Sequence, residues 1–409
     1  VTCLAGHPVA KQGRAAPALA IAAIGSFVAG CVATFVIGFA APILTSFALK
    51  FGAAEYFSLM VLGLVASVVL ARGSLLKAIA MVVFGICLGT IGTDTNLGMP
   101  RYTFGMPELY DGLSFVALAM GMFGFGEIIA NLEQEGERDV LQRPIRRLMP
   151  TRADMRASWK PILRGTALGS VLGVLPGGGS VVGSFSSYAL EKKLSKDPSR
   201  FGRGAIEGVA GPEAANNAGA QTSFIPLLTL GIPSNAVMAL MMGAMMIQGV
   251  LPGPLLISER PDMFWGVIAS MLVGNMMLVI LNLPLIGIWV KLLTVPYRWL
   301  FPAIVLFCAI GVYSTNNNVF DIWIVALFGL IGYIFIKLGC EPAPLLLGLV
   351  LGPMMEEYLR RALLISRGDW SVFVTRPISA SLLAAAVLLL VIVVSPSIKK
   401  KREEAFVEE

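Results

Sequence analysis

The sequence GVLPGGGSVVG, residues 173–183, interrupts a stretch of the chain that is otherwise apolar enough to lie in a lipid bilayer. Proline cannot donate a backbone hydrogen bond and glycine adopts backbone conformations closed to other residues, so a membrane helix cannot run straight through residues 176–179. Within hydrocarbon, irregular backbone is tolerated only where it is buried in protein or lines a wet cavity. The stretch therefore predicts two half-helices with a loop between them, the second beginning near Ser180.

The composition around this break is that of a membrane protein. Of the 409 residues, 56% are hydrophobic and 14% are charged, and the mean hydropathy is +0.79, which lies outside the range of soluble domains. Apolar runs of roughly membrane-spanning length recur along the whole chain. They cover residues 17–49, 57–71, 75–92, 112–131, 162–190, 205–230, 233–250, 264–293, 299–313, 319–338, 342–354 and 378–395. We therefore expect an all-α, polytopic membrane protein in which several spans are short or are cut by glycine and proline.

The basic residues lie beside the apolar runs. A net charge of +6 would suit a nucleic-acid partner, but the lysines and arginines cluster in short segments at residues 138–164, 192–203 and 399–402. This pattern is typical of cytoplasmic loops, and we expect all three segments to face the cytoplasm. Because both ends of residues 162–190 would then lie on one side, we expect that run to be a hairpin that enters the membrane and returns.

Residues that build metal, redox or nucleotide sites are sparse. The five cysteines are scattered without CxxC spacing and are expected to be small core residues. His7 is the single histidine, so a metal site is not expected. The sequence contains no P-loop, so ATP drive is not encoded in it.

The sequence also shows weak internal similarity at a period of about 244 residues. Residues 24–30, IGSFVAG, match residues 268–274, IASMLVG, and residues 83–85 match residues 327–329 at the same offset. Their common order predicts a duplication, and the charge pattern makes the two copies inverted, as in many secondary transporters. The predicted organisation is a first transmembrane repeat at 1–131, a basic cytoplasmic linker at 132–164, a second repeat at 165–377, and a final helix with a charged tail at 378–409.

The chain begins without an initiator methionine or a signal-peptide pattern. We expect the first repeat to be truncated at its N-terminus, because the counterpart of residues 173–183 would fall before Val1.

A second break, TLGIPSN at residues 229–235, interrupts the next apolar run. Helix breaks followed by Ser or Asn form the discontinuous-helix sites of transporters, where bare N–H groups hold anions and carbonyls hold cations. Glu213 lies between the two breaks and is a candidate to hold Na⁺ or carry a proton. The alternatives are a glycine-rich kink for close packing and a helix-start glutamate stabilised by the helix dipole.

A third polar cluster occupies residues 92–103. Asp94 and Arg101 in this cluster are candidates to pair with each other or to meet substrate. The alternative is an exterior loop with a surface salt bridge.

Three long stretches resemble the TctA family, the large membrane subunits of tripartite tricarboxylate transporters. They are residues 173–256, which begin with GVLPGGGSVVGSFSSYALEKKL, residues 92–113, GTDTNLGMPRYTFGMPELYDGL, and residues 343–363, APLLLGLVLGPMMEEYLRRAL. The family's two Pro-Gly-rich breaks correspond to residues 176–179 and 231–235. Members usually carry Pro-Gly at the second break, whereas here Pro233 is followed by Ser234, which we expect still to cap the next helix.

The resemblance implies a carrier in the bacterial inner membrane. Such a carrier takes citrate or a related carboxylate from a periplasmic solute-binding protein and works beside a small membrane subunit. It imports the carboxylate with an ion gradient of Na⁺ or H⁺ and needs no other cofactor, and neither enzymatic activity nor nucleic-acid binding is implied.

These considerations give a set of expected site residues. The expected substrate-binding residues are Pro176, Gly177, Gly178, Gly179, Ser180, Asn216, Asn217, Thr229, Gly231, Pro233, Ser234 and Asn235, and the expected ion-coupling residues are Glu213 and Asp94. Two other classes of protein remain as alternatives, a passive anion channel and an intramembrane enzyme. The enzyme would need a nucleophile with a base, and one histidine outside the apolar runs argues against it.

Overall fold

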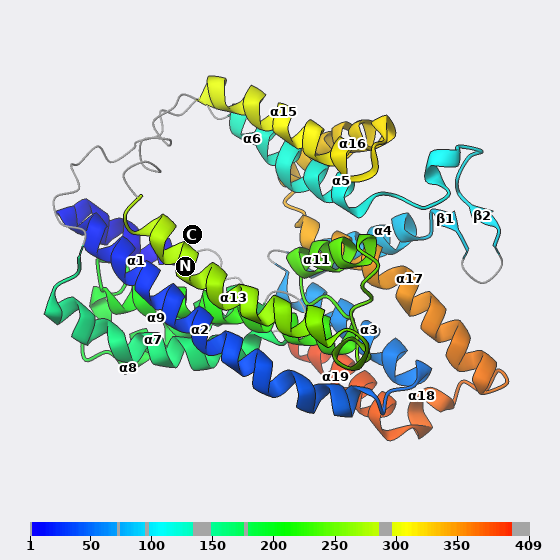
Figure 1. Cartoon of the computed structure of the whole chain (residues 1–409), viewed down its shortest axis with the longest axis horizontal. Coiled ribbons are helices and arrows are strands. Elements are labelled where there is room, and N and C mark those ends of the chain that lie inside the picture. The colour runs from blue at the N-terminus through cyan, green and yellow to red at the C-terminus, as the bar shows by residue number, and fades with distance from the viewer. Residues whose placement is uncertain are drawn as a thin grey trace. The chain divides into compact units, whose positions relative to one another are not determined.

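The computed structural model describes residues 2–71, 74–94, 98–133, 149–175, 179–285 and 297–394, and its regular elements are helices apart from one pair of two-residue strands (Figure 1). The chain divides into two compact units, each made of three stretches of sequence. Unit 1 comprises Val1–Ala48, Glu137–Ser234 and Val250–Val295, and unit 2 comprises Leu49–Gly136, Asn235–Gly249 and Pro296–Glu409.

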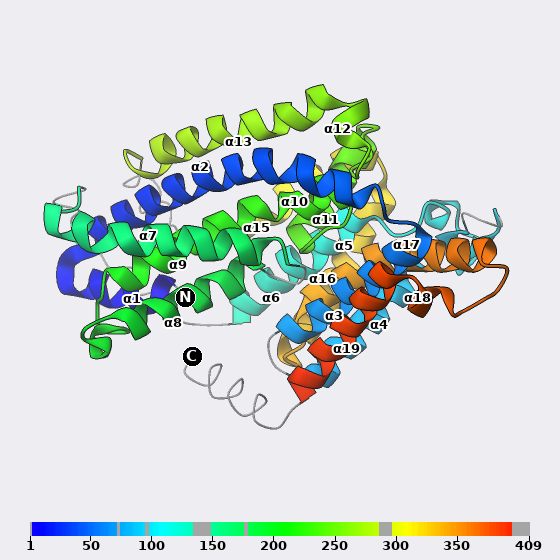
Figure 2. The ribbon, with the colours of Figure 1, turned by 90° about the horizontal axis from the view of Figure 1, so that it is seen from below.

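Unit 1 contains both the first break and most of the second. Its elements are α1 (Thr2–Val9), the π-helix η1 (Ala10–Arg14), α2 (Ala15–Ala48), α7 (Arg152–Gly173), α8 (Gly179–Leu194), the 3-10 helix η4 (Pro198–Arg200), α9 (Glu207–Thr222), α10 (Phe224–Leu230), α12 (Leu256–Glu259) and α13 (Pro261–Asn282). Helices α7, α8 and α9 lie side by side, and α2 packs along α9 (Figure 2). The α2–α9 contact is made largely by buried alanines, so these backbones approach closely.

Glycines bring α7 against α9. The facing pairs are Gly165 with Gly211, Gly169 with Ala215, and Gly173 with Gly219. A Cβ atom at any of the three α7 glycines would lie 2.2–2.4 Å from a carbonyl oxygen of α9. Repeats of small residues at four-residue spacing allow membrane helices to pack at this distance, where dispersion and weak backbone contacts replace the missing hydrophobic effect.

Helix α8 runs back along α7. A Cβ atom on Gly179 would lie 2.1 Å from the carbonyl oxygen of Leu172, and one on Gly183 would lie 3.4 Å from the Cα of Gly169. The two helices are therefore an antiparallel pair, in agreement with the hairpin expected over residues 162–190. The entry of this hairpin into the membrane stays a prediction.

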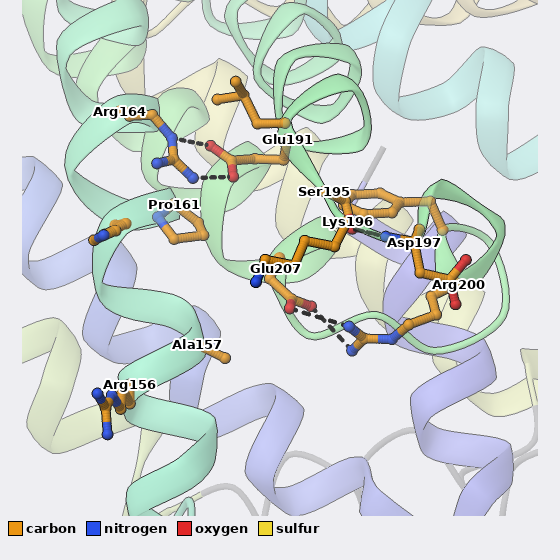
Figure 3. Close-up of a pocket in the computed structure, with 13 residues that line it drawn as sticks. Arg156, Ala157, Pro161, Arg164, Glu191, Ser195, Lys196, Asp197, Arg200 and Glu207 are labelled. Carbon is orange, nitrogen blue, oxygen red and sulfur yellow. Dashed lines mark hydrogen bonds and ion pairs between the residues drawn. The ribbon is translucent and has the colours of Figure 1, made fainter.

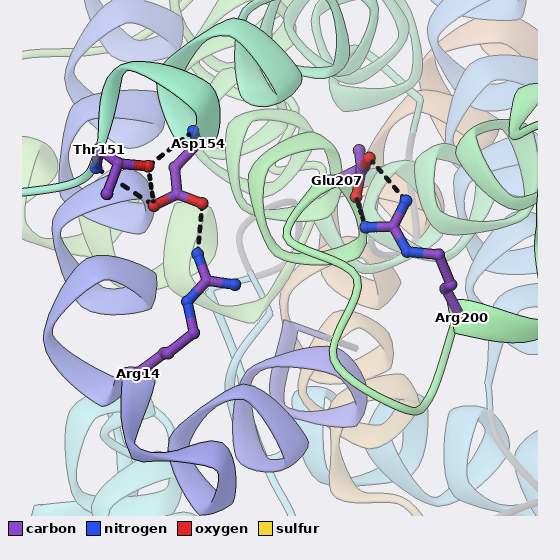
Figure 4. A network of polar contacts seen from close by, with 5 residues as sticks. All are labelled: Arg14, Thr151, Asp154, Arg200 and Glu207. Carbon is purple, nitrogen blue, oxygen red and sulfur yellow. Dashed lines mark hydrogen bonds and ion pairs between the residues drawn. The ribbon is translucent and has the colours of Figure 1, made fainter.

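Polar contacts fix the ends of the unit 1 helices (Figure 4). Thr151 and Asp154 form a capping box at the start of α7, and Arg14 of η1 forms an ion pair with the same Asp154 carboxylate. Arg200 of η4 pairs with Glu207 in the first turn of α9, at 3.4 Å. Of these contacts, the Arg14–Asp154 pair joins segments far apart in sequence, whereas the other two are local.

Unit 2 is built around α17. Its elements are α3 (Ala53–Leu70), α4 (Leu75–Gly89), β1 (Gly92–Thr93), β2 (Pro100–Arg101), the 3-10 helix η2 (Pro107–Leu109), α5 (Phe115–Ala119), the π-helix η3 (Met120–Phe125), α6 (Gly126–Glu133), α11 (Ala236–Ile247), α15 (Tyr297–Asn316), α16 (Val319–Lys337), α17 (Pro342–Ile365), α18 (Val372–Thr375) and α19 (Pro377–Val394). Strands β1 and β2 pair antiparallel, with Gly92 opposite Arg101. Helix α17 packs on α3 and α4, and α16 packs on the continuous helix formed by α5, η3 and α6.

Close glycine contacts recur in unit 2. A Cβ atom on Gly85 of α4 would lie 2.0 Å from the carbonyl oxygen of Leu345, and one on Gly348 of α17 would lie 2.4 Å from that of Val82. Around this crossing lies the apolar core of the unit, with Leu118, Met122 and Leu345 almost fully buried.

The all-α fold and the positions of the apolar helices are confirmed. Five helices are long and apolar enough to cross a membrane: Pro17–Ala48, Phe115–Glu133, Pro261–Asn282, Trp299–Asn316 and Val319–Lys337. All five coincide with predicted runs. The basic residues at 138–147 and at 399–402 lie outside the described residues, so their expected cytoplasmic placement stays a prediction, as does the division into repeats.

Candidate functional site

The first break separates two packed helices of unit 1. Helix α7 ends at Gly173, and α8 is described from Gly179. Pro176, Gly177 and Gly178 lie outside the described residues. The first turn of α8 lies against α9, since a Cβ atom on Gly219 would be 2.8 Å from the Cα of Ser180. The start of a 16-residue helix is thereby held at the helix interface, where the helix dipole presents a partial positive charge.

The second break begins with a left-handed residue. Gly231 has φ 69° and ends α10, and its N–H donates to the Leu227 carbonyl at 3.0 Å. A Cβ atom here would lie 2.6 Å from the Pro252 carbonyl oxygen, so glycine is required both by backbone conformation and by space.

The next helix is capped by Asn235 and not by Ser234. The Met238 N–H donates to Asn235 Oδ1 at 3.0 Å, and Asn235 has the extended backbone of an N-cap residue. Ser234 is 1% exposed, and its hydroxyl instead donates to the Ser223 carbonyl at 3.3 Å. The expectation that Ser234 caps the helix is therefore wrong, because its side chain turns into unit 1.

Ser223 connects the two broken stretches. Its hydroxyl lies within hydrogen-bond distance of two carbonyl oxygens, that of Gly219 at 2.7 Å and that of Gly173 at 3.1 Å, and its own carbonyl accepts from Ser234 at 3.3 Å. The end of α7 and the segment after α10 are thus fastened to the same residue, although they are far apart in sequence. Ser223 is fully buried, so these bonds form away from water and are costly to leave unmade.

Glu213 lies in a cluster of neutral donors. Its carboxylate accepts hydrogen bonds from Thr2 Oγ1 at 2.8 Å, from Ser26 Oγ at 3.2 Å and from Asn217 Nδ2 at 3.3 Å. Asn217 also donates to Ser26 Oγ at 2.7 Å. Within the described ranges, no lysine or arginine forms an ion pair with Glu213. A half-buried carboxylate in this setting is suited to hold a cation or a proton.

Other predicted residues lie on α9, on α10 and in the second break. Thr229 is fully buried, and its hydroxyl donates to the Ile225 carbonyl one turn back in α10. Asn216 is half-buried on α9, and Pro233 is buried in the second break. All three residues therefore belong to unit 1. The hydrogen bond from the Thr229 hydroxyl to its own helix is typical of a residue with a structural role.

Asn275 of α13 faces α2 and α9 within unit 1. It is 5% exposed, and its Oδ1 accepts from Gln221 Nε2 at 3.3 Å. A Cβ atom on Gly30 of α2 would lie 2.5 Å from that oxygen. Among the described atoms, Asn275 Nδ2 and Gln221 Oε1 are buried without a hydrogen-bond partner, which is costly in an apolar interior.

Asp94 belongs to an ion-pair network in unit 2. Its carboxylate lies 3.4 Å from Arg101 and 3.3 Å from Arg360, and both arginines also pair with Glu356. Asp94 is 3% exposed and lines a small cavity of about 70 Å³. The expected pairing of Asp94 with Arg101 is confirmed, and in this pair Asp94 is buried while Arg101 is partly exposed.

No group of three or more His, Cys, Asp or Glu residues in the described part of the chain could hold a metal ion. The side chain of His7 lies outside the described residues.

Several residues that build these clusters are not among the predicted ones. Thr2, Ser26, Ser223, Asn275 and Glu356 were not predicted as site residues. Ser26 and Asn275 are single polar residues within long apolar runs, and that isolation is the signal that could have drawn attention to them. Their partners are not visible in the sequence.

Comparison with known proteins relates the chain to one family. A sequence model described as "Tripartite tricarboxylate transporter TctA family" matches residues 1–347. Two proteins of Agrobacterium vitis are similar. The chain is 59% identical over 409 residues to "Uncharacterized 52.8 kDa protein in TAR-I ttuC' 3'region", covering 100% of this chain and 82% of that protein. It is 64% identical over 241 residues to "Uncharacterized protein in TAR-II ttuC' 3'region", covering 59% of this chain and 100% of that protein. No solved structure matches.

Proposed function

Because the chain belongs to the tripartite tricarboxylate transporter TctA family, it is a multi-pass membrane transporter subunit and not an enzyme, and we propose that it imports a tricarboxylate or related carboxylate by ion-coupled secondary transport. In this proposal a periplasmic solute-binding protein delivers the substrate, and a small membrane subunit assembles with the chain in the bacterial inner membrane. Family membership supports each of these partners.

The substrate carboxylates bind at the first break in this proposal. The N-terminus of α8 offers free N–H groups and a positive dipole end, which suit a carboxylate. The observation that carries the proposal is the pair of hydrogen bonds at Ser223, which hold the Gly173 carbonyl and Ser234 to one residue over 3.1 and 3.3 Å. A substrate bound at the first break can then affect the second break through Ser223. We include Pro176, Gly177, Gly178, Gly179 and Ser180 in this site.

The second break supplies the other side of the site. Gly231, Pro233 and Ser234 contribute main-chain polar groups that a continuous helix would hide, and Thr229 lies one turn before them. Asn216 and Asn217 project from α9, and Asn235 follows at the start of α11. We propose that these residues complete carboxylate recognition.

Glu213 couples the ion in this proposal. Its carboxylate is met by Thr2, Ser26 and Asn217, all neutral donors. A bound Na⁺ or proton would neutralise the Glu213 carboxylate, with which no described lysine or arginine side chain forms an ion pair. Asp94, the other expected coupling residue, already faces two guanidinium groups, which makes Glu213 the stronger candidate.

Inverted repeats supply the moving parts of such carriers. Helices α4 and α16 begin at Leu75 and Val319, which are 244 residues apart, and both start after a capping-type residue. The matched glycines Gly85 and Gly329 both sit at close helix crossings. These correspondences support the duplication that the sequence predicts.

The test is uptake into proteoliposomes containing the full-length subunit, its small subunit and its binding protein. A panel of di- and tricarboxylates is offered with and without a Na⁺ gradient and with and without a pH gradient. We expect saturable accumulation of at least one carboxylate under one of the two gradients. Flux that continues without any gradient and does not saturate would indicate a channel, and the absence of carboxylate transport under every gradient would overturn the proposal.

A further inference from the structure

Helix α7 carries two parallel stripes of different chemistry. The cationic stripe is Arg152, Arg156, Lys160 and Arg164, and the apolar stripe is Met155, Trp159 and Leu163. Both stripes have a four-residue spacing, so each follows one face of the helix. Trp159 is 48% exposed and Leu163 is 45% exposed. An exposed Trp beside arginines and lysines is typical of the membrane–water interface.

Three members of the cationic stripe, Arg156, Lys160 and Arg164, line one wall of a cavity of about 310 Å³ (Figure 3). The opposite walls come from the end of α8, from η4 and from the start of α9. Five basic side chains and three acidic side chains line it: Arg156, Lys160, Arg164, Lys196 and Arg200, with Glu191, Asp197 and Glu207. The cavity is therefore positive overall.

Two of the lining cations are already neutralised. Arg164 donates from Nε to Glu191 at 2.8 Å, and Arg200 pairs with Glu207 at 3.4 Å. Arg156, Lys160 and Lys196 form no ion pair within the described part of the chain. Three cations and the Asp197 carboxylate thus line the hollow outside these two pairs, and the remaining excess of positive charge suits a bound phosphate group.

A second hollow of about 440 Å³ adjoins the first and is mainly apolar. It is lined by Arg152, Met155, Arg156, Trp159 and Lys160. Arg156 and Lys160 line both hollows, so these two side chains stand between a cationic cavity and an apolar one. A ligand that fills both must be an amphiphile with an anionic head.

We propose that this site binds an anionic phospholipid. The phosphate group lies among Arg156, Lys160 and Lys196, and the acyl chains lie along Met155 and Trp159. Basic pockets between helices at the edge of a membrane hold such headgroups, and each buried CH₂ of an acyl chain adds favourable apolar transfer. The lipid would bridge α7 to the α8–α9 connection and so hold the helices on either side of the first break.

The apolar hollow distinguishes a lipid from a soluble anion. Inorganic phosphate or a carboxylate would use the cationic cavity alone and would leave Trp159 uninvolved. A lipid uses both hollows, so removal of the aromatic ring must weaken its binding as well.

The experiment measures lipid binding to the purified full chain by native mass spectrometry, with phosphatidylglycerol and with phosphatidylcholine as the probes. The test variant is Arg156→Gln with Lys160→Gln. The matched control is Lys192→Gln with Lys193→Gln, which removes two exposed charges from the last turn of α8 that do not line either hollow. A third variant, Trp159→Ala, tests the apolar hollow, and a titration with inorganic phosphate tests competition.

We expect a preference for phosphatidylglycerol in the parent chain and in the control. The test variant should weaken phosphatidylglycerol binding about 30-fold, on the basis of ~1 kcal/mol for each charge near a membrane surface and 1.4 kcal/mol for each tenfold change. Trp159→Ala should also weaken it. If the test variant does not fold, Lys196→Gln alone should lower the preference for phosphatidylglycerol.

Three results would overturn the proposal. The first is equal binding of both lipids by the parent chain, and the second is an equal loss in the control, which would mean that only general charge matters. The third is full competition by inorganic phosphate together with unchanged binding in Trp159→Ala, which would make the cavity a soluble-anion site.

Discussion

A Cβ atom on Gly169 of α7 would lie 2.2 Å from the carbonyl oxygen of Ala215 on α9. This contact is the centre of the glycine-lined crossing that sets the distance between the two helices. Helix α9 carries Glu213, Asn216 and Asn217, and α7 ends at the first break. The distance between these α9 side chains and the end of α7 therefore depends on the absence of a side chain at Gly169.

We expect Gly169→Ala to destabilise the protein by about 1–3 kcal/mol, because the added methyl group must push α9 away. Thermal unfolding of the detergent-solubilised protein measures this. The matched control is Gly274→Ala on α13, where a Cβ atom meets nothing within 4 Å. The control should be neutral or slightly stabilising. Equal effects of the two substitutions would contradict the close crossing.

Removal of the Ser223 hydroxyl should weaken the connection between the broken stretches. Ser223→Ala leaves the Gly173 carbonyl without its donor, and we expect a loss of about 1 kcal/mol in stability together with slower transport. The control is Ser270→Ala, since the exposed Ser270 hydroxyl bonds only to the Val267 carbonyl of its own helix. Transport at the parental rate in Ser223→Ala would show that the connection is not used.

Neutralising Glu213 should uncouple transport from its ion. Glu213→Gln keeps the shape and can still accept from Ser26, but it removes the negative charge that would neutralise a bound cation and the carboxylate that would take up a proton. We expect gradient-driven uptake to fall at least about 30-fold, which corresponds to ~2 kcal/mol for removing the charged partner of a bound ion. The measurement is uptake into proteoliposomes with an imposed gradient. Glu207→Gln, on the same helix and paired with Arg200, should transport normally, and a normal gradient response of Glu213→Gln would rule out its coupling role.

Asp94 provides the contrasting case. Asp94→Asn leaves Arg101 and Arg360 with Glu356 as their one remaining acidic partner in this network, and we expect a loss of about 1–2 kcal/mol in stability because both arginines are partly exposed. The ion dependence of transport should not change. Glu357→Gln, which breaks an exposed pair with Arg361, is the control for stability. An altered ion dependence in Asp94→Asn would instead assign ion coupling to Asp94.

Acidification should release the contact at the start of α7. Burial acts to raise the pKa of Asp154, but hydrogen bonds from Arg14 and Thr151 and the Arg14 charge lower that pKa further, so it lies below the ordinary value. Because the folded-state pKa is the lower one, the stabilisation is complete above about pH 4 and is lost as the pH falls through the folded-state pKa.

Thermal unfolding measured between pH 7 and pH 3 tests this effect. Asp154→Asn should remove part of the acid-induced loss of stability. Asp262→Asn, at an exposed aspartate of α13, removes the same number of carboxylates and should leave that loss unchanged. Identical acid profiles for Asp154→Asn and the parent protein would contradict the prediction.

Local signals in the sequence predicted the helices and the breaks with good accuracy. Hydropathy located the runs that became α2, α13 and α16, because each is apolar over a membrane-spanning length. Gly231 and Asn235 behave as their residue types predict, one as a left-handed helix end and the other as an N-cap. The capping role expected for Ser234 was wrong because its hydroxyl donates to the Ser223 carbonyl, a contact that depends on how the segment after α10 folds back to the start of that helix.

The sequence alone determined that this chain is a helical membrane protein with two interrupted segments. Both features are local, because hydropathy belongs to the residues of each run and glycine and proline restrict the backbone at their own positions. Tertiary structure alone decided which polar groups meet. Ser26 reaches Glu213 across 187 residues, and Arg156 and Lys160 come to stand between two hollows only when α7, α8 and α9 pack together. Such contacts require two helix backbones to approach closely. Small residues permit this approach, but they do not specify which helix will be the partner.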